Sequence, residues 1–139
     1  MASQNWWCVV FKDIKTGKER VVTSDNAGLV LNTIRQNTLL IGFNIKRYDM
    51  LILSAIVKGA TPQEVHKLSG KIIGENGKNT IGQVDYYNKF SFQDLMDDWN
   101  AGGLKVFESN FGLQVLECPI KFSKQHLTDE DKQTIIDYC

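Results

Sequence analysis

The residues best placed for chemistry lie in the stretch IGFNIKRYDMLIL, residues 41–53. Asp49 brings a carboxylate to the start of an apolar run, close to Asn44 and to the cations Lys46 and Arg47. A carboxylate can hold a metal ion such as Mg²⁺, and lysine or arginine can bind a phosphate. The alternative is structural: Asp49 is a first-turn acid favoured by the helix dipole, Asn44 ends a strand, and the two cations are solvated.

These residues stand between a predicted strand and a predicted helix. TLLIGFN, residues 38–44, is a compact apolar run typical of a buried strand. RYDMLILSAIVKG, residues 47–59, is typical of a helix with one apolar face, and Gly59 follows as a stop signal. The pattern therefore places Asp49 in the first turn of a helix, just beyond a strand.

A β-hairpin is predicted over residues 5–25. Aromatic and β-branched residues occupy both sides of a KTGK turn in which Gly17 can adopt a positive φ. Trp6 and Trp7 would point to opposite faces of the strand, so we expect one in the core and the other partly exposed, where it could anchor a binding partner. The alternative is that the next element covers the second tryptophan.

The rest of the chain alternates between predicted helices, loops and strands. Helices are predicted over 26–37, 61–70, 104–111 and 128–138, a glycine- and asparagine-rich loop over 74–82, and a strand, turn and strand over 84–95. Trp99, Phe107 and Phe111 are expected in the core. This alternation favours an α/β or α+β fold with a mixed sheet flanked by helices, in a single domain spanning residues 1–139.

Composition excludes several classes of protein. The 139 residues are 42% hydrophobic and 23% charged, as in ordinary globular domains. Equal numbers of acids and bases give a formal net charge of zero, so a general nucleic-acid binder is not expected. Three scattered cysteines and two histidines form no zinc-site pattern. Without a leader pattern or an apolar run of about 18 residues, we expect a cytoplasmic protein and no membrane partner.

Residues 44–49, NIKRYD, match N-x-x-x-[FY]-D, and this stretch resembles the second motif of the DEDD family of 3′-5′ exonucleases. The downstream segments FSFQDLM, GGLKVFESNFGL and the acidic-start helix ending IIDYC are similar to the exonuclease domains of bacteriophage DNA polymerases. The resemblance implies a ribonuclease H-like fold, with Asp49 on a metal-binding position and Tyr138 on the tyrosine of the third motif, Y-x-x-x-D.

The chain also departs from that family. No D-x-E motif precedes Trp6, and no aspartate follows Tyr138 at the expected spacing. Asp13, Asp94, Asp97 and Glu108 do not match the missing metal-binding positions. In a ribonuclease H-like sheet the first motif lies on a central strand, so we expect the sheet to be incomplete there, and to be repaired by rearrangement or by self-association into a homo-oligomer.

Three functions remain open on this basis. The first is a catalytically incomplete phage protein that needs no cofactor and acts by binding, for example as an inhibitor of a host nuclease or defence complex in the host cytoplasm, with an anti-CRISPR role as one form. The second is a fragment of a magnesium-dependent 3′-5′ exonuclease whose remaining acids lie outside this chain. The third is a single-stranded DNA-binding module. On any of these, the candidate binding residues are Asn44, Lys46, Arg47, Trp6 and Trp7.

Overall fold

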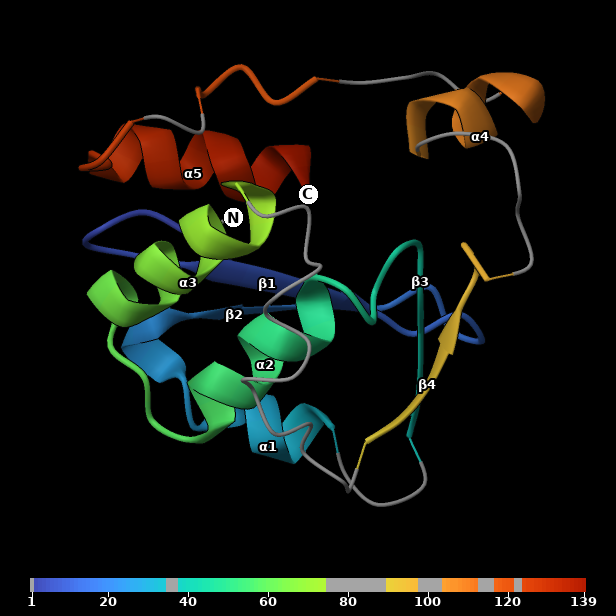
Figure 1. Ribbon diagram of the computed structural model, residues 1–139, viewed down its shortest axis with the longest axis horizontal. Coiled ribbons are helices and arrows are strands. Elements are labelled where there is room, and N and C mark those ends of the chain that lie inside the picture. The colour runs from blue at the N-terminus through green and yellow to red at the C-terminus, as the bar shows by residue number, and fades with distance from the viewer. Residues whose placement is uncertain (1, 35–37, 75–89, 98–103, 113–116, 122–123) are drawn as a thin grey trace.

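The computed structural model describes residues 2–34, 38–74, 90–97, 104–112, 117–121 and 124–139 (Figure 1). Its elements are β1 (Cys8–Lys12), β2 (Glu19–Thr23), the 3₁₀ turn η1 (Ser24–Asn26), α1 (Leu29–Thr33), β3 (Leu39–Gly42), α2 (Asp49–Val57), α3 (Pro62–Gly74), β4 (Ser91–Asp94), α4 (Leu104–Asn110) and α5 (Asp129–Tyr138). The mixture of helices and strands confirms the predicted α+β class. None of the described helices is both long and apolar enough to cross a membrane.

The predicted hairpin is confirmed. β1 and β2 pair antiparallel from Cys8 opposite Thr23 to Lys12 opposite Glu19. The turn between them depends on Gly17, which has a φ of +70°, and on the Asp13 carboxylate, whose Oδ1 accepts hydrogen bonds from two backbone N–H groups of the turn at 2.9 Å. Asp13 is therefore a turn-forming acid.

The described strands form two separate sheets instead of the single mixed sheet that the sequence favours. β1 and β2 make one sheet, and β3 and β4 make a second, parallel one. In the view of Figure 1 the strands of one sheet run across those of the other. Parallel pairing brings residues 39–42 beside residues 91–94, which are far apart in the sequence.

The prediction that residues 38–44 form a buried strand holds for one face of β3 only. Leu40 is 9% exposed and belongs to the main core, whereas Leu39 is 57% and Ile41 44% exposed. Successive side chains of a strand point to opposite faces. Among the described residues, packing therefore covers only the face of β3 that carries Leu40.

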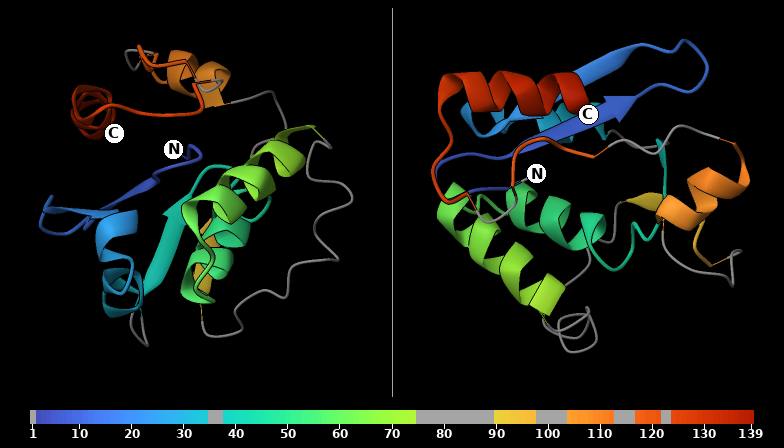
Figure 2. Two further views of the ribbon diagram at one scale, coloured as in Figure 1. Left: turned by 90° about the vertical axis from the view of Figure 1, so that its left-hand side faces the viewer. Right: turned by 90° about the horizontal axis from the view of Figure 1, so that it is seen from above.

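Helix α2 is the centre of the main core. The predicted single apolar face is too narrow, because six of its nine residues are buried: Met50, Leu51, Ile52, Leu53, Ser54 and Ile56. α2 contacts both α1 and α3, and Figure 2 shows α2 and α3 lying side by side. Neighbours on several sides bury the helix almost all round, so its hydrophobic residues need not follow one stripe. Gly59, with a φ of +89°, follows its end as predicted.

Helices α3 and α5 begin with the capping boxes that their sequences indicate. Glu64 Oε2 accepts from the Thr61 N–H at 2.8 Å, and Asp131 Oδ2 accepts from the Thr128 N–H at 2.8 Å. α3 continues to Gly74, four residues beyond its predicted end. α1 covers only five residues of its predicted segment.

Both tryptophans of the hairpin are buried, so the expectation that one is partly exposed is wrong. Trp6 and Trp7 are each 2% exposed. Trp7 packs into the main core with Val22 and α2, and Trp6 packs into a second cluster with Cys8, Leu127 and Ile135. Helix α5 covers the second face of β1, as Figures 1 and 2 show, and this second layer is what the strand pattern alone does not reveal.

The segment before β1 folds back and joins three elements. Ala2 bridges to Trp7, and the Ala2 carbonyl lies 3.2 Å from His66 Nδ1 of α3. The Asn5 side chain donates to the Leu127 carbonyl at 3.2 Å and accepts from the Leu127 N–H at 3.1 Å. The segment before β1 is therefore tied to α3 and to Leu127, just before α5.

Helix α4 lies away from the main core in Figure 1, and Gly112, which has a φ of +67°, follows its end as the sequence predicts. Phe111 is 62% exposed, so its expected place in the core is wrong. Several predicted features lie outside the described residues: Trp99, the Phe107 side chain, loop residues 75–82 and the predicted strand that begins at Val84.

Candidate functional site

The candidate site lies at the carboxyl ends of the two parallel strands. Asn44, Lys46 and Asp49 follow β3, while Asp94 and Asp97 come at the end of β4. Loops at the carboxyl edge of parallel strands are the usual position of ligand sites in α/β sheets. The strand pairing thus brings together residues that are distant in the sequence.

Asn44 makes the turn that leads from β3 to α2. It has a φ of +57°, a left-handed conformation that asparagine tolerates better than most residues, and its carbonyl accepts from the Arg47 N–H at 3.2 Å. Ile45 then folds back over Gly42, where an added Cβ would lie 3.1 Å from the Ile45 side chain. The small residue Gly42 therefore permits the loop to pack against the strand.

Asp94 holds this loop from the neighbouring strand. Its side chain is 3% exposed, and its two oxygens accept from the Lys46 N–H at 3.1 Å and the Met96 N–H at 3.0 Å. The Leu95 N–H also donates to the Gly42 carbonyl at 2.9 Å. Hydrogen bonds to a buried carboxylate are strong, so Asp94 fixes the backbone at both strand ends.

Lys46 and Arg47 have different environments. The Lys46 ammonium lies 2.6 and 2.7 Å from the two carboxylate oxygens of Asp97, and its side chain is 36% exposed. Arg47 is exposed. The Lys46 charge is therefore engaged within the site, whereas the Arg47 guanidinium reaches the surface.

Asp49 is the first residue of α2, as predicted, and its side chain reaches the surface. Protein packed around the carboxylate removes part of its hydration and raises its pKa to about 6, while its own backbone N–H opposes this change and repulsion from Asp94 adds to it. The charges on Asp49 and Asp94 therefore interact. Sites with such raised pKa values are often functional.

Asn44 carries an acceptor without a partner. Its side-chain Oδ1 is buried and has no hydrogen bond among the described residues. A buried oxygen left in this state costs about 1–3 kcal/mol. Asn44 Oδ1 and the Asp49 carboxylate are oxygen ligands of the kind that Mg²⁺ prefers. In the part of the chain that the structure describes, no three His, Cys, Asp or Glu side chains gather closely enough to share a metal ion.

The other predicted site residues lie elsewhere. Trp6 and Trp7 are buried in the two cores, and Tyr138 is 38% exposed on the last turn of α5, the helix that packs on β1. Asp94 and Asp97 match no metal-binding position of the family, so the sequence pattern does not reveal their roles in holding the loop. The available signal was an acid at the carboxyl end of the strand FSFQD.

Comparison with known proteins finds no relative: no family model matches the sequence, and no curated protein or solved structure is significantly similar to the chain.

Proposed function

We propose that this chain is a catalytically incomplete, ribonuclease H-like relative of the exonuclease domains of bacteriophage DNA polymerases, and that it acts by binding another protein. The order of elements supports the proposal: a hairpin, then the strand β3 and helix α2 bearing the N-x-x-x-Y-D residues, then a parallel partner strand. The candidate residues Asn44 and Asp49 lie at the carboxyl edge of the parallel pair.

The binding role is supported mainly by one observation: most charged side chains of the site bind other groups of the protein. Both oxygens of Asp94 accept backbone N–H groups, and the Lys46 ammonium is paired with Asp97. Hydrolysis of a phosphodiester by two metal ions needs several carboxylates, because the ions lie about 4 Å apart and each needs ligands. The charges of Asp94, Lys46 and Asp97 instead stabilise the loop that presents Arg47 and Asp49.

The exposed charges favour a protein partner over a nucleic acid. Arg47 and Asp49 are both exposed at the same turn, and Asp97 stands beside Lys46. A phosphate backbone is bound by clustered positive charge, and the two acids would repel it. A protein surface with one acidic and one basic group complements the pair Arg47 and Asp49. Given the resemblance to phage enzymes, the partner class is a host nuclease or defence complex that the chain inhibits, with an anti-CRISPR role as one form.

The test is capture from lysate of a phage-susceptible bacterium, with the wild-type chain and the charge reversals Arg47→Glu and Asp49→Arg as baits. The matched control is Lys15→Glu in the exposed hairpin turn. We expect the wild type and the control to retain a nuclease complex and lower its activity, and the two site variants to lose both effects.

Three results would contradict the proposal. The first is no retained protein at micromolar bait, and the second is equal retention by the site variants. The third is steeply salt-dependent binding of single-stranded DNA by the chain alone, which would indicate the DNA-binding module instead.

A second candidate function is a magnesium-dependent 3′-5′ exonuclease whose remaining acids are supplied from outside these residues. The raised pKa of Asp49, which comes mainly from burial and in smaller part from repulsion by Asp94, favours it, because a bound cation would stabilise the ionised carboxylate. Extending the chain on both sides should then give magnesium-dependent degradation of single-stranded DNA. Asp49→Ala should abolish this activity, whereas Glu130→Gln, an exposed first-turn acid of α5, should not.

A further inference from the structure

One face of the parallel sheet formed by β3 and β4 is open to solvent. Leu39 and Ile41 of β3 are 57% and 44% exposed, and they pair in register with Ser91 and Gln93 of β4, which are also exposed. Leu95, 36% exposed, follows β4 and continues the alternation, because its N–H extends the backbone pairing with β3. The outer face of the sheet therefore consists of Leu39, Ile41, Ser91, Gln93 and Leu95.

The opposite face of the same sheet is packed. Leu40 belongs to the main core with residues of α2, and Phe92 is partly buried against that core. Sheets of parallel strands are found almost only with both faces covered. A parallel pair that keeps an apolar face in water is therefore incomplete by itself, and we expect another surface to cover the outer face.

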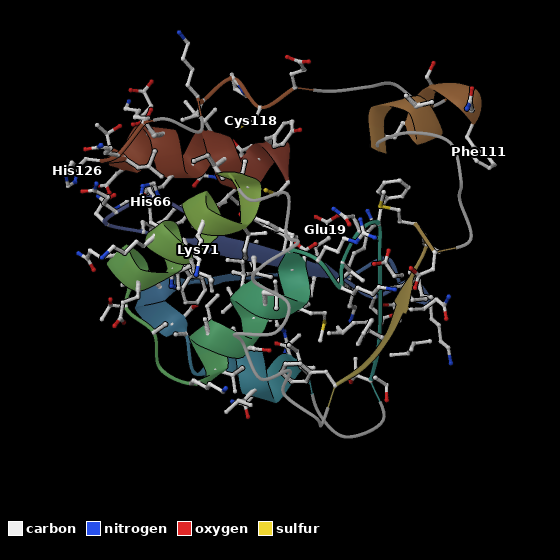
Figure 3. All side chains as sticks on the ribbon, in the orientation of Figure 1. Glu19, His66, Lys71, Phe111, Cys118 and His126 are labelled. Carbon is white, nitrogen blue, oxygen red and sulfur yellow. The ribbon has the colours of Figure 1, made fainter. Side chains whose placement is uncertain are left out.

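Helix α4 adds apolar surface at the same end of the molecule. It lies toward the end that carries β3 and β4 in Figure 1 and in the right-hand view of Figure 2. Val106 is 47% and Phe111 62% exposed, and Figure 3 shows the Phe111 side chain pointing outward from the helix. Exposed apolar side chains that gather in this way mark interaction surfaces.

We propose that the outer face of β3 and β4 packs against the same face of a second copy of this chain, about a two-fold axis. In such a pair each surface must complement itself. The outer face meets this requirement because none of its five side chains is charged, whereas a face with charges of one sign would repel its copy. The whole chain has a formal net charge of zero, so two copies do not repel each other at longer range.

The size of the outer face determines how strong this contact is. Two sheets that pack face to face lie about 10 Å apart, with their strands within about 30° of each other. The leucine and isoleucine side chains then form the apolar centre of the contact, and Ser91 and Gln93 supply polar groups. Because the face has only five residues, the contact belongs to the small, transient class of interfaces. The dimer should therefore form only at high protein concentration.

Sedimentation velocity of the full 139-residue chain tests the proposal at concentrations from about 10 µM to about 1 mM. We expect the wild type to change from monomer to dimer over this range. Leu39→Lys and Ile41→Lys should raise the dissociation constant about tenfold or more, because each lysine places a charge in the apolar contact. The matched controls are Ile73→Lys on α3 and Leu31→Lys on α1, which replace side chains that are 60% and 45% exposed. Both controls should dimerise as the wild type does.

Two further measurements separate loss of the contact from loss of the fold. Circular dichroism and thermal melting of dilute, monomeric samples should give the same result for every variant and the wild type. Ile41→Thr should also weaken dimerisation, because threonine keeps the β-branched shape that strands favour but removes apolar surface.

Three results would overturn the proposal. The first is a wild type that stays monomeric at the highest concentration, which would leave the outer face to a different partner. The second is equal dimerisation by the outer-face variants and the controls. The third is assembly that continues beyond the dimer, because a head-to-tail contact, and not a two-fold one, produces open chains.

Discussion

The backbone N–H of Lys46 donates a hydrogen bond to the carboxylate of Asp94 at 3.1 Å, across 48 positions of sequence. This contact joins the loop after β3 to the end of β4, the two segments that make up the candidate site. The geometry of the site therefore depends on a carboxylate that is 3% exposed and whose position depends on the pairing of two parallel strands.

Asp94→Ala should destabilise the protein more than any surface change on the same strand. The substitution leaves the N–H groups of Lys46 and Met96 without their acceptor, at a cost of about 2–4 kcal/mol in the free energy of unfolding. Urea denaturation measures this cost, and Ser91→Ala, exposed on β4, is the control. Equal midpoints for the two variants would mean that Asp94 does not hold the loop.

Two substitutions of Asn44 test whether its backbone is left-handed. Asn44→Gly and Asn44→Ala both remove the unpartnered Oδ1, but only glycine accepts a φ of +57° without strain. The alanine variant should therefore be less stable than the glycine variant by about 1–2 kcal/mol. Thermal or urea unfolding of the two variants makes the comparison, and the opposite order would exclude a left-handed conformation at this position.

Asp49→Asn should change how stability depends on pH. The pKa of Asp49 is raised from 3.8 to about 6, so the folded state binds a proton more tightly than the unfolded state. The wild type should lose stability relative to the variant as pH rises from about 4 to about 6, with no further change above that window. Because the side chain is exposed, solvent screening should limit the loss to about 0.5–1 kcal/mol. Unfolding curves of the wild type and the variant at a series of pH values test this prediction. A difference in stability that does not change with pH would show that the pKa of Asp49 is not raised.

The contribution of Asp131 to stability should depend on pH in the opposite direction to that of Asp49. Its pKa is lowered to about 2, first by the hydrogen bond from the Lys124 ammonium at 2.6 Å and then by the backbone and hydroxyl of Thr128. The stabilisation is complete above pH 3.8 and is lost as pH falls towards 2. Asp131→Asn should therefore be less stable than the wild type at neutral pH, and the two should converge in acid. Acid titration followed by circular dichroism measures this, with Asp137→Asn, exposed on the same helix, as the control.

Local elements of this fold can be predicted from the sequence. The hairpin, the cap at Thr128 and the stop at Gly59 follow from turn and capping chemistry that acts over a few residues. Asp49 was correctly placed at the first turn of α2 for the same reason.

Features that depend on distant packing could not be predicted. Burial of both Trp6 and Trp7 requires α5 to cover the second face of the hairpin, and nothing in the strand pattern specifies that layer. The role of Asp94 depends on β4 pairing with β3 in one register. A sequence pattern is local, whereas each of these features is set by residues more than 40 positions away.

The turn between β1 and β2 offers a practical opportunity. Residues 13–18 are all exposed. A fluorescent dye or a surface tether introduced at Lys15 should therefore leave the fold intact, which would allow immobilised or single-molecule measurements on the protein.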